Sequence, residues 1–213
     1  MLEKKTISDY VYEQILEDIV QLRYAPGEKI SETQLAAVLE VSRAPIKSAL
    51  AKLEKEGFVK IKPQYGTFVS EISVERAEGI CDIREILEAQ AVRRAVRNIT
   101  DEQLEYLEKQ FARMDALQDD DEGKRQFIYE VDGMLHDAIY KAGRNVIIAE
   151  IMQRYMPEIQ RIQRANMTWA DRKEPTQAEM RRILKALKER DEEQAVAAMK
   201  EHISNIRETI KKL

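Results

Sequence analysis

Apolar residues recur at intervals of three and four along the first sixty residues, the spacing of one face of an α-helix. The first such stripe stops at the Ala-Pro-Gly sequence 25–27. Ser31 and Ser42 are good N-cap residues in front of a second and a third stripe. The pattern therefore predicts helices over residues 8–22, 31–39 and 42–57.

The period then changes from that of a helix to that of a strand. Val59 and Ile61 alternate with lysines, residues 63–66 read Pro-Gln-Tyr-Gly, and Thr67 to Val69 continue with strand-forming residues. This predicts a β-hairpin. After residue 72 only helical periodicity remains, and it predicts helices over 74–97, 101–117, 123–142, 145–166, 175–189 and 192–211.

We therefore expect a mostly α-helical protein of two domains. Residues 1–72 have the element order of a winged helix-turn-helix, with three helices and a β-hairpin. Residues 73–213 form an all-helical domain, and no long linker separates the two.

Composition narrows the class of protein. The chain is 35% charged and 6% aromatic with 7 glycines, which favours a folded helical protein. No apolar run approaches the ~20 residues that cross a bilayer, and the N-terminus lacks the apolar stretch of a signal peptide. Cys81, the single cysteine, suits a reducing compartment and is expected in the core. These features predict a cytoplasmic protein with no membrane partner.

The charge distribution modifies this picture. The net charge of −4 argues against nucleic acid, but residues 41–70 contain six Lys or Arg and only two Asp or Glu. A basic segment in an acidic protein is either a solvated helix face or a surface for a polyanion.

The third predicted helix favours the polyanion. In a helix-turn-helix the first turn of the second motif helix must reach base edges while its apolar stripe stays buried. Arg43 lies in that first turn, where the helix dipole disfavours a cation unless an anion is bound. The expected DNA contacts are Ser42, Arg43, Ala44 and Lys47, together with the hairpin tip, Gln64, Tyr65, Gly66 and Thr67.

The segment 26–69 resembles the winged helix-turn-helix of GntR-type bacterial transcription regulators. The family pattern is met by Pro26, Gly27, Ser31, Glu32, Leu35, Ala36, Val41, Ser42, Arg43, Pro45, Ile46, Ala49, Leu50, Leu53, Gly57, Gly66 and Val69. Ile30 replaces a leucine, and Lys47-Ser48 replaces the common Arg-Glu, so position 47 loses the bidentate fork of arginine. The resemblance implies a homodimer that binds a palindromic double-stranded operator through these positions.

The helical half contains both histidines of the chain. Asp132 and His136 stand four residues apart in a predicted helix, so both side chains project from one face. This spacing suits a metal site and equally a buried hydrogen-bonded pair.

The same half resembles the FCD-type effector domain of a large GntR subgroup, through residues 82–96, 132–145 and 178–203. The resemblance implies an antiparallel helical bundle whose cavity takes a small carboxylate effector. In many members one Asp and three His hold a divalent metal there. Asp132, His136 and His202 match three of these ligands, whereas Met180 stands at the fourth position. A thioether suits such ions poorly, so either Gln177 or Glu179 substitutes, or the effector is bound without a metal.

Three further residues of this half have two interpretations each. Arg84 matches a family arginine suited to a carboxylate, or forms a surface pair with Glu88. Asn145 contacts the effector or caps a helix. Trp169, in a predicted loop over 166–175, covers the cavity or anchors the loop.

The predicted function is therefore a ligand-responsive, DNA-binding transcription regulator and not an enzyme. The alternative is a metal-dependent, hydrolase-like helical enzyme tethered to a DNA-binding module, in which Asp132 and His136 activate water. No nucleophile motif or Gly-rich phosphate loop supports that alternative. A third possibility is a bundle that only dimerises.

Overall fold

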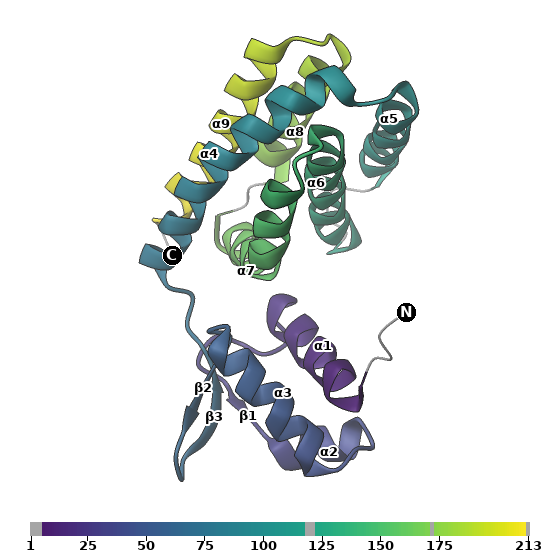
Figure 1. Ribbon diagram of the computed structural model, residues 1–213. Coiled ribbons are helices and arrows are strands. Elements are labelled where there is room, and N and C mark those ends of the chain that lie inside the picture. The colour runs from purple at the N-terminus through teal and green to yellow at the C-terminus, as the bar shows by residue number, and fades with distance from the viewer. Residues whose placement is uncertain (1–5, 118–121, 171–172, 212–213) are drawn as a thin grey trace. The chain divides into compact units, whose positions relative to one another are not determined.

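The computed structural model describes residues 6–117, 122–170 and 173–211. These residues divide into two compact units, residues 1–73 and 74–213, each with its own core (Figure 1). Within the described residues no helix is both long and apolar enough to cross a lipid bilayer.

The first unit contains three helices and a small antiparallel sheet. Its elements are α1 (Ile7–Val20), β1 (Lys29–Ile30), α2 (Glu32–Val38), α3 (Arg43–Lys55), β2 (Val59–Lys62) and β3 (Gly66–Val69). The three predicted helices and the hairpin are confirmed. The short strand β1 was not predicted; it pairs with β3, so the strand order is β1-β3-β2.

One apolar core holds the first unit together. Val11, Ile15 and Ile19 of α1 pack with Ile46 and Leu50 of α3, and all five are fully or almost fully buried. Local signals set the ends of these helices. Thr6 forms a capping box at the start of α1, and Gly57 has a φ of 88°, the left-handed conformation that ends a helix.

The second unit is an all-helical bundle, as predicted. It consists of α4 (Val74–Asn98), α5 (Asp101–Ala116), α6 (Glu122–Gly143), α7 (Val146–Ala170), α8 (Lys173–Lys188) and α9 (Glu192–Ile210). The predicted loop over 166–175 is wrong for most of its length, because α7 continues through Ala170 and α8 begins at Lys173. The side chain of Trp169 lies outside the described part of the chain.

Helix α6 is surrounded by the other helices of the bundle. It packs against α4, α5, α7 and α8, while α4 and α9 lie along each other and α8 packs on α9 (Figure 1). The inner faces of α4, α6, α8 and α9 therefore meet in one interior region.

Candidate functional sites

The first turns of α3 present polar and basic side chains at the surface of the first unit. Ile46, Ala49, Leu50 and Leu53 occupy the buried face of this helix. The predicted DNA contacts Ser42, Arg43, Ala44 and Lys47 are all exposed. Burial of the apolar stripe thus forces these four residues outward.

Arg43 and Ser42 differ in how they are held. A guanidinium nitrogen of Arg43, Nη2, donates to Thr33 Oγ1 of α2 at 3.2 Å, which links the starts of the two helices. Ser42 is the N-cap residue of α3, as predicted, but its hydroxyl makes no capping hydrogen bond. The first turn of α3 therefore keeps backbone N–H groups that an anion can bind.

The tip of the hairpin exposes three of its four predicted contact residues at least in part. Gln64 and Gly66 have positive φ angles of 66° and 117°, and Tyr65 is 73% exposed. Thr67 is only 2% exposed, because alternation along β3 turns Thr67 and Val69 toward the core. The side chain of Thr67 is therefore not at the surface, contrary to what a DNA contact requires.

The sheet has a basic face that the sequence alone did not reveal. Lys29 and Lys60 both pair with Phe68 in the strand register, and Lys62 pairs with Gly66, so all three lysines share one face of the sheet. The ammonium groups of Lys29 and Lys62 lie 6.0 and 4.9 Å from the centroid of the Phe68 ring. We refer to Lys29, Lys60 and Lys62 as the basic wing face.

Helix α3 and the wing are tied together by a side chain. Glu54 Oε1 of α3 accepts a hydrogen bond from the backbone N–H of Ile61 in the edge strand β2 at 2.7 Å. This contact joins the last turn of α3 to the strand that carries Lys60 and Lys62, within the same compact unit.

The second unit brings Asp132 and both histidines together inside the bundle. Asp132 and His136 come from α6 and His202 from α9, and each is at most 3% exposed. Asp132 Oδ1 lies 3.6 Å from His136 Nε2 and 3.4 Å from His202 Nε2. Of the described residues, these three are the group whose ligand atoms lie close enough together for one metal ion.

Two further carboxylates orient the histidines from behind. Glu88 Oε2 of α4 lies 2.6 Å from His136 Nδ1, and Glu179 Oε2 of α8 lies 2.9 Å from His202 Nδ1. A carboxylate hydrogen-bonded to Nδ1, as Glu179 is to His202, keeps a proton on Nδ1 and leaves the Nε2 lone pair free to bind. His136 Nδ1 and Glu88 Oε2 are close together, but neither atom has a hydrogen-bond partner among the described residues. Both Nε2 atoms face Asp132 Oδ1, so Glu88 and Glu179 lie on the far sides of the two imidazoles from Asp132.

Asp132 and Arg84 make further contacts in this cluster. Gln163 Nε2 of α7 donates to Asp132 Oδ2 at 2.6 Å, which fixes the carboxylate and leaves Oδ1 toward the histidines. Arg84 Nε donates to Glu88 Oε1 at 2.7 Å, and Arg84 Nη2 lies 3.4 Å from His136 Nε2. The pair of Arg84 and Glu88 forms as the sequence spacing allows, but in the interior and not on the surface.

These buried charges perturb one another strongly. Burial alone would lower the pKa of His136, but the carboxylates of Glu88 and Asp132 outweigh it and raise that pKa to about 9. Burial alone would also raise the pKa of Asp132, yet His136, His202 and Arg84 hold it well below its usual range. Similarly, Arg84 and His136 outweigh the desolvation of Glu88 and lower its pKa to about 2.

Formal charges indicate that the cluster lacks positive charge. Glu88, Asp132 and Glu179 are three carboxylates, and Arg84 is one guanidinium, so with neutral histidines a charge of −2 is buried. Either protonation of the histidines or one divalent cation balances that charge.

The donor atoms fit a divalent cation. Ligand atoms bound to one ion at ~2.1 Å lie about 3.0 to 3.5 Å apart, close to the separations from Asp132 Oδ1 to the two Nε2 atoms. Asp132 Oδ1 and His202 Nε2 are buried and have no hydrogen-bond partner among the described residues. Two imidazoles and one carboxylate also form a ligand set that transition-metal ions accept.

The expected substitutes for a fourth protein ligand do not join this set. Met180 is fully buried in α8, and Glu179 is occupied with His202 Nδ1 and with Asn205, whose amide donates to it at 2.9 Å. Gln177 of α8 is half-buried. An ion held by three protein ligands keeps open positions for other ligands.

Asn145 lies elsewhere in the bundle. It precedes α7, and its Oδ1 accepts a hydrogen bond from the backbone N–H of Ile148 at 3.2 Å. This is a helix-capping contact, the second of the two interpretations of this residue. Cys81 is buried, as expected for a core residue.

Comparison with known proteins assigns a family model to each half. The model described as bacterial regulatory proteins, gntR family, matches residues 7–69, and the FCD domain model matches residues 79–205. Both resemblances drawn from the sequence motifs are thereby confirmed.

Relatives match nearly the whole chain. The HTH-type transcriptional repressor RspR of Escherichia coli (strain K12) is 26% identical over 211 residues, which cover 97% of this chain and 90% of that protein. The uncharacterized HTH-type transcriptional regulator YdhC of Bacillus subtilis (strain 168) is 29% identical over 193 residues, covering 90% and 84%. Among solved structures, E. coli McbR/YncC has the same fold, with a TM-score of 0.80, 20% identity and coverage of 98% and 99%.

Proposed function

We propose that this chain binds its operator as a homodimer, under the control of a small organic acid. The chain belongs to the GntR family of bacterial transcriptional regulators and carries an FCD domain. Its family and relatives are DNA-binding regulators, so the prediction that it is not an enzyme is confirmed and the hydrolase alternative is set aside. Such a regulator acts where the chromosome lies, and we expect it in the cytoplasm.

The first unit reads the DNA. Arg43 is placed to bind guanine O6 and N7 in the major groove, Lys47 to bind a phosphate or a guanine, and Ser42 and Ala44 to lie against the same groove. Gln64, Tyr65 and Gly66 at the hairpin tip lie toward a neighbouring groove or backbone. The basic wing face adds phosphate contacts that are independent of sequence.

A homodimer follows from the size of the reading surface. One recognition helix covers only a few base pairs, and two copies related by a two-fold axis double the contact on a palindromic operator. Arg43 and Lys47 of each copy then read one half-site.

The second unit senses the organic acid through the buried cluster. Asp132, His136 and His202 would hold one divalent cation, and when bound that ion would supply positive charge that attracts a carboxylate. Arg84 Nη2 lies 3.4 Å from His136 Nε2, and this guanidinium would pair with the same carboxylate if its contact with His136 is released. A ligand that favours one arrangement of α4, α6 and α9 then shifts the population that binds DNA.

One observation carries this proposal. The Nε2 atoms of two histidines and one carboxylate oxygen converge in the bundle interior, while the carboxylates of Glu88 and Glu179 lie beside the two Nδ1 atoms. A purely structural cluster would use these atoms in hydrogen bonds with each other, yet Asp132 Oδ1 and His202 Nε2 have no such partner among the described residues.

The test combines metal analysis with a ligand screen. We expect the purified chain to contain about one divalent ion per protomer, and small organic acids to raise its melting temperature by mass action. The variant His136→Ala should lose both the bound ion and the rise in melting temperature, whereas Asp137→Ala, a change of a half-exposed residue on the same helix, should keep both. If organic acids raised the melting temperature of His136→Ala as much as that of the unchanged chain, the effector would bind elsewhere.

A further inference from the structure

The guanidinium of Arg43 is held by a side chain from another helix. Arg43 Nη2 at the start of α3 donates to Thr33 Oγ1 in the first turn of α2 at 3.2 Å, although both residues are exposed. Among the described residues Arg43 forms no ion pair with a carboxylate. Its charge is therefore not neutralised by these residues and stays available to DNA.

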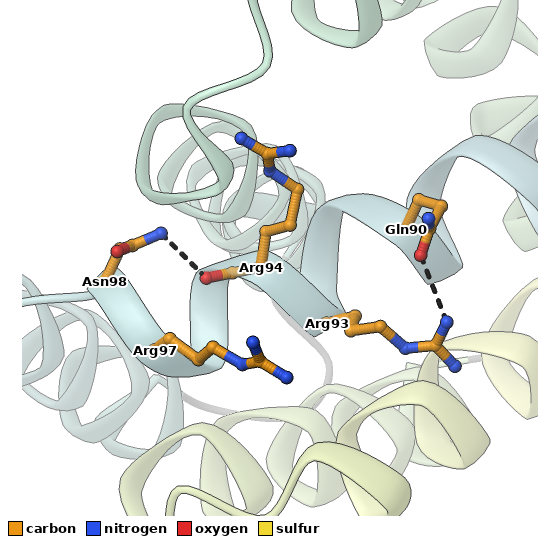
Figure 2. Close-up of a pocket in the computed structure, with 5 residues that line it drawn as sticks. All are labelled: Gln90, Arg93, Arg94, Arg97 and Asn98. Atoms are coloured by element: carbon orange, nitrogen blue, oxygen red, sulfur yellow. Dashed lines mark hydrogen bonds between the residues drawn. The ribbon is translucent and has the colours of Figure 1, made fainter.

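Exposed arginines of the second unit are engaged differently. A pocket of about 310 Å³ on α4 is lined by Gln90, Arg93, Arg94, Arg97 and Asn98 (Figure 2). Arg97 contacts the carboxylate of Glu192, and Arg94 extends to another side of α4 (Figure 2). There Arg94 donates to the carbonyl oxygen of Gly143 at 2.6 Å. These contacts connect helices of the bundle, whereas the partner of Arg43 is a neutral hydroxyl beside the predicted DNA contacts.

A guanidinium can hold Thr33 and a base at the same time. It carries five N–H donors in a fixed planar fork, and the hydroxyl of Thr33 uses one of them. A bidentate contact with guanine O6 and N7 needs two more. The contact with Thr33 therefore limits rotation of the Arg43 side chain and leaves enough donors to bind the base.

The position of Thr33 is fixed by the fold of α2. Ser31 caps this helix by accepting from the backbone N–H of Gln34 at 3.3 Å, and Leu35 anchors the helix in the core of the first unit. Two residues along a helix differ in direction by about 200°, so burial of Leu35 turns Thr33 outward. Threonine is also branched at Cβ, which leaves its hydroxyl few rotamers. The acceptor that Arg43 meets is thus well fixed.

Lys47, one turn farther along α3, has no such support. It is exposed and forms no hydrogen bond or ion pair among the described residues. Its ammonium is a point charge on a flexible stem, which adds affinity for a phosphate or a guanine but imposes little orientation. Discrimination between bases at the start of α3 therefore depends more on Arg43 than on Lys47.

We propose that Thr33 is a positioning residue for Arg43: its hydroxyl holds the guanidinium in the orientation that reads guanine and so contributes to base specificity. The inference rests on the contact of Arg43 with guanine in the proposed function and adds to it a residue of α2. An arginine held before binding loses less side-chain entropy on the DNA. Thr33 thus acts on recognition through Arg43, without itself touching a base.

The first step of the test identifies the guanine that Arg43 reads. A duplex selected by the unchanged protein is prepared with each guanine replaced in turn by 7-deazaguanine, which lacks the N7 acceptor. Fluorescence anisotropy measures the ratio of the affinity for the guanine duplex to that for the 7-deazaguanine duplex. The guanine whose ratio falls to about 1 in Arg43→Ala is the one that Arg43 contacts.

The second step changes Thr33. Thr33→Val keeps the branched shape and removes the hydroxyl, and we expect the ratio at that guanine to fall about 3- to 10-fold, as for loss of one hydrogen bond. Thr33→Ser keeps the hydroxyl and should retain most of the ratio. Ratios at guanines that Arg43 does not contact should stay the same in both variants, and melting temperature checks the fold.

A direct contact of Thr33 with the DNA backbone predicts a different result. Thr33→Val would then weaken binding to all the duplexes alike, and would do so equally in the Arg43→Ala background. That result would overturn the inference. A positioning role instead predicts that Thr33→Val changes nothing further once the side chain of Arg43 is absent.

The outcomes separate this inference from the proposed function. If Arg43→Ala leaves every ratio unchanged, Arg43 does not read a guanine and the inference fails with that contact. If Arg43→Ala identifies a guanine and Thr33→Val keeps the ratio there, Thr33 is not a positioning residue while the contact of Arg43 stands.

Discussion

The two halves of this regulator hold their candidate functional groups in opposite environments. Arg43 and Lys47 are exposed at the start of α3, above an apolar stripe that folds without them. Asp132, His136 and His202 are at most 3% exposed and are bound into a network of carboxylates, an arginine and a glutamine. The proposed DNA-reading residues can thus be changed without loss of folding stability, whereas the proposed sensing residues are part of the core of the bundle.

The largest effect expected from this difference is on unfolding of the helical half. Asp132→Ala removes the anion that both histidines face, and breaking such a buried charge pair costs about 3 kcal/mol. Urea unfolding measures the change, with Asp137→Ala as the control. Asp137 is half-exposed and pairs with Lys141, so its loss should cost under ~0.5 kcal/mol. Equal stability of the two variants would contradict the account.

The buried cluster should also make the metal-free protein sensitive to pH. The pKa of His136 is about 9 in the folded protein, above the ordinary histidine value of 6.5. Its protonation therefore stabilises the fold fully below about pH 6.5, and this contribution disappears as pH rises through about 9. Unfolding of chelator-treated protein should show a loss on the order of 2 kcal/mol over that range. If the free energy of unfolding did not change between these pH values, and His136→Gln had no effect on it, protonation of His136 would not be the cause.

Substitution at the start of α3 should affect DNA binding and leave stability alone. Arg43→Ala removes the side chain placed to bind guanine, so affinity for a duplex selected by the unchanged protein should fall about 10- to 100-fold. Fluorescence anisotropy measures this. Lys55→Ala, at the other end of the same exposed helix face, is the control and should change affinity much less. If Arg43→Ala also lowered the melting temperature, the loss of affinity could not be assigned to DNA contact alone.

Removal of the carboxylate charge beside His202 Nδ1 should have an intermediate effect, on metal affinity. Glu179→Gln keeps the size of the side chain but removes the charge behind Nδ1, and metal affinity should fall about tenfold. Competition with a chromogenic chelator measures it. Glu201→Gln, an exposed change on α9, serves as the control. If both variants bind the ion as tightly as the unchanged protein, Glu179 does not position His202.

The smallest effect is expected at the basic wing face. Lys62→Ala should weaken binding only a few-fold and to a similar extent for all DNA sequences, since a phosphate contact carries no sequence information. The slope of log affinity against log salt should become shallower by about 1. A selective loss for one operator sequence would instead indicate a base contact by Lys62.

The sequence predicted the first half in more detail than the second because its signals are local. Helix stripes, caps and the hairpin turn can each be recognised within a few residues. Strand β1 was missed because it has two residues and pairs with β3 almost forty positions later, which also hid the place of Lys29 in the basic wing face. Thr67 was assigned to the tip because alternation along β3 becomes certain only when the register is known.

In the helical half, the sequence identified the candidate ligand residues but not their surroundings. Asp132 and His136 are four apart on one helix, and the family resemblance added His202. Glu88, Gln163 and Glu179 come from three other helices, and only packing brings them to the cluster. The spacing of Arg84 and Glu88 predicts contact on any helix face, so it could not distinguish a surface pair from this buried one.

Control by an organic acid requires that the buried cluster and the exposed start of α3 be linked. The decisive measurement is operator affinity with and without an organic acid that stabilises the unchanged protein, repeated in His202→Ala. The account predicts that the acid changes affinity of the unchanged protein at least several-fold and that His202→Ala, still folded and still binding DNA, shows no response. A response of the same size in His202→Ala would contradict it.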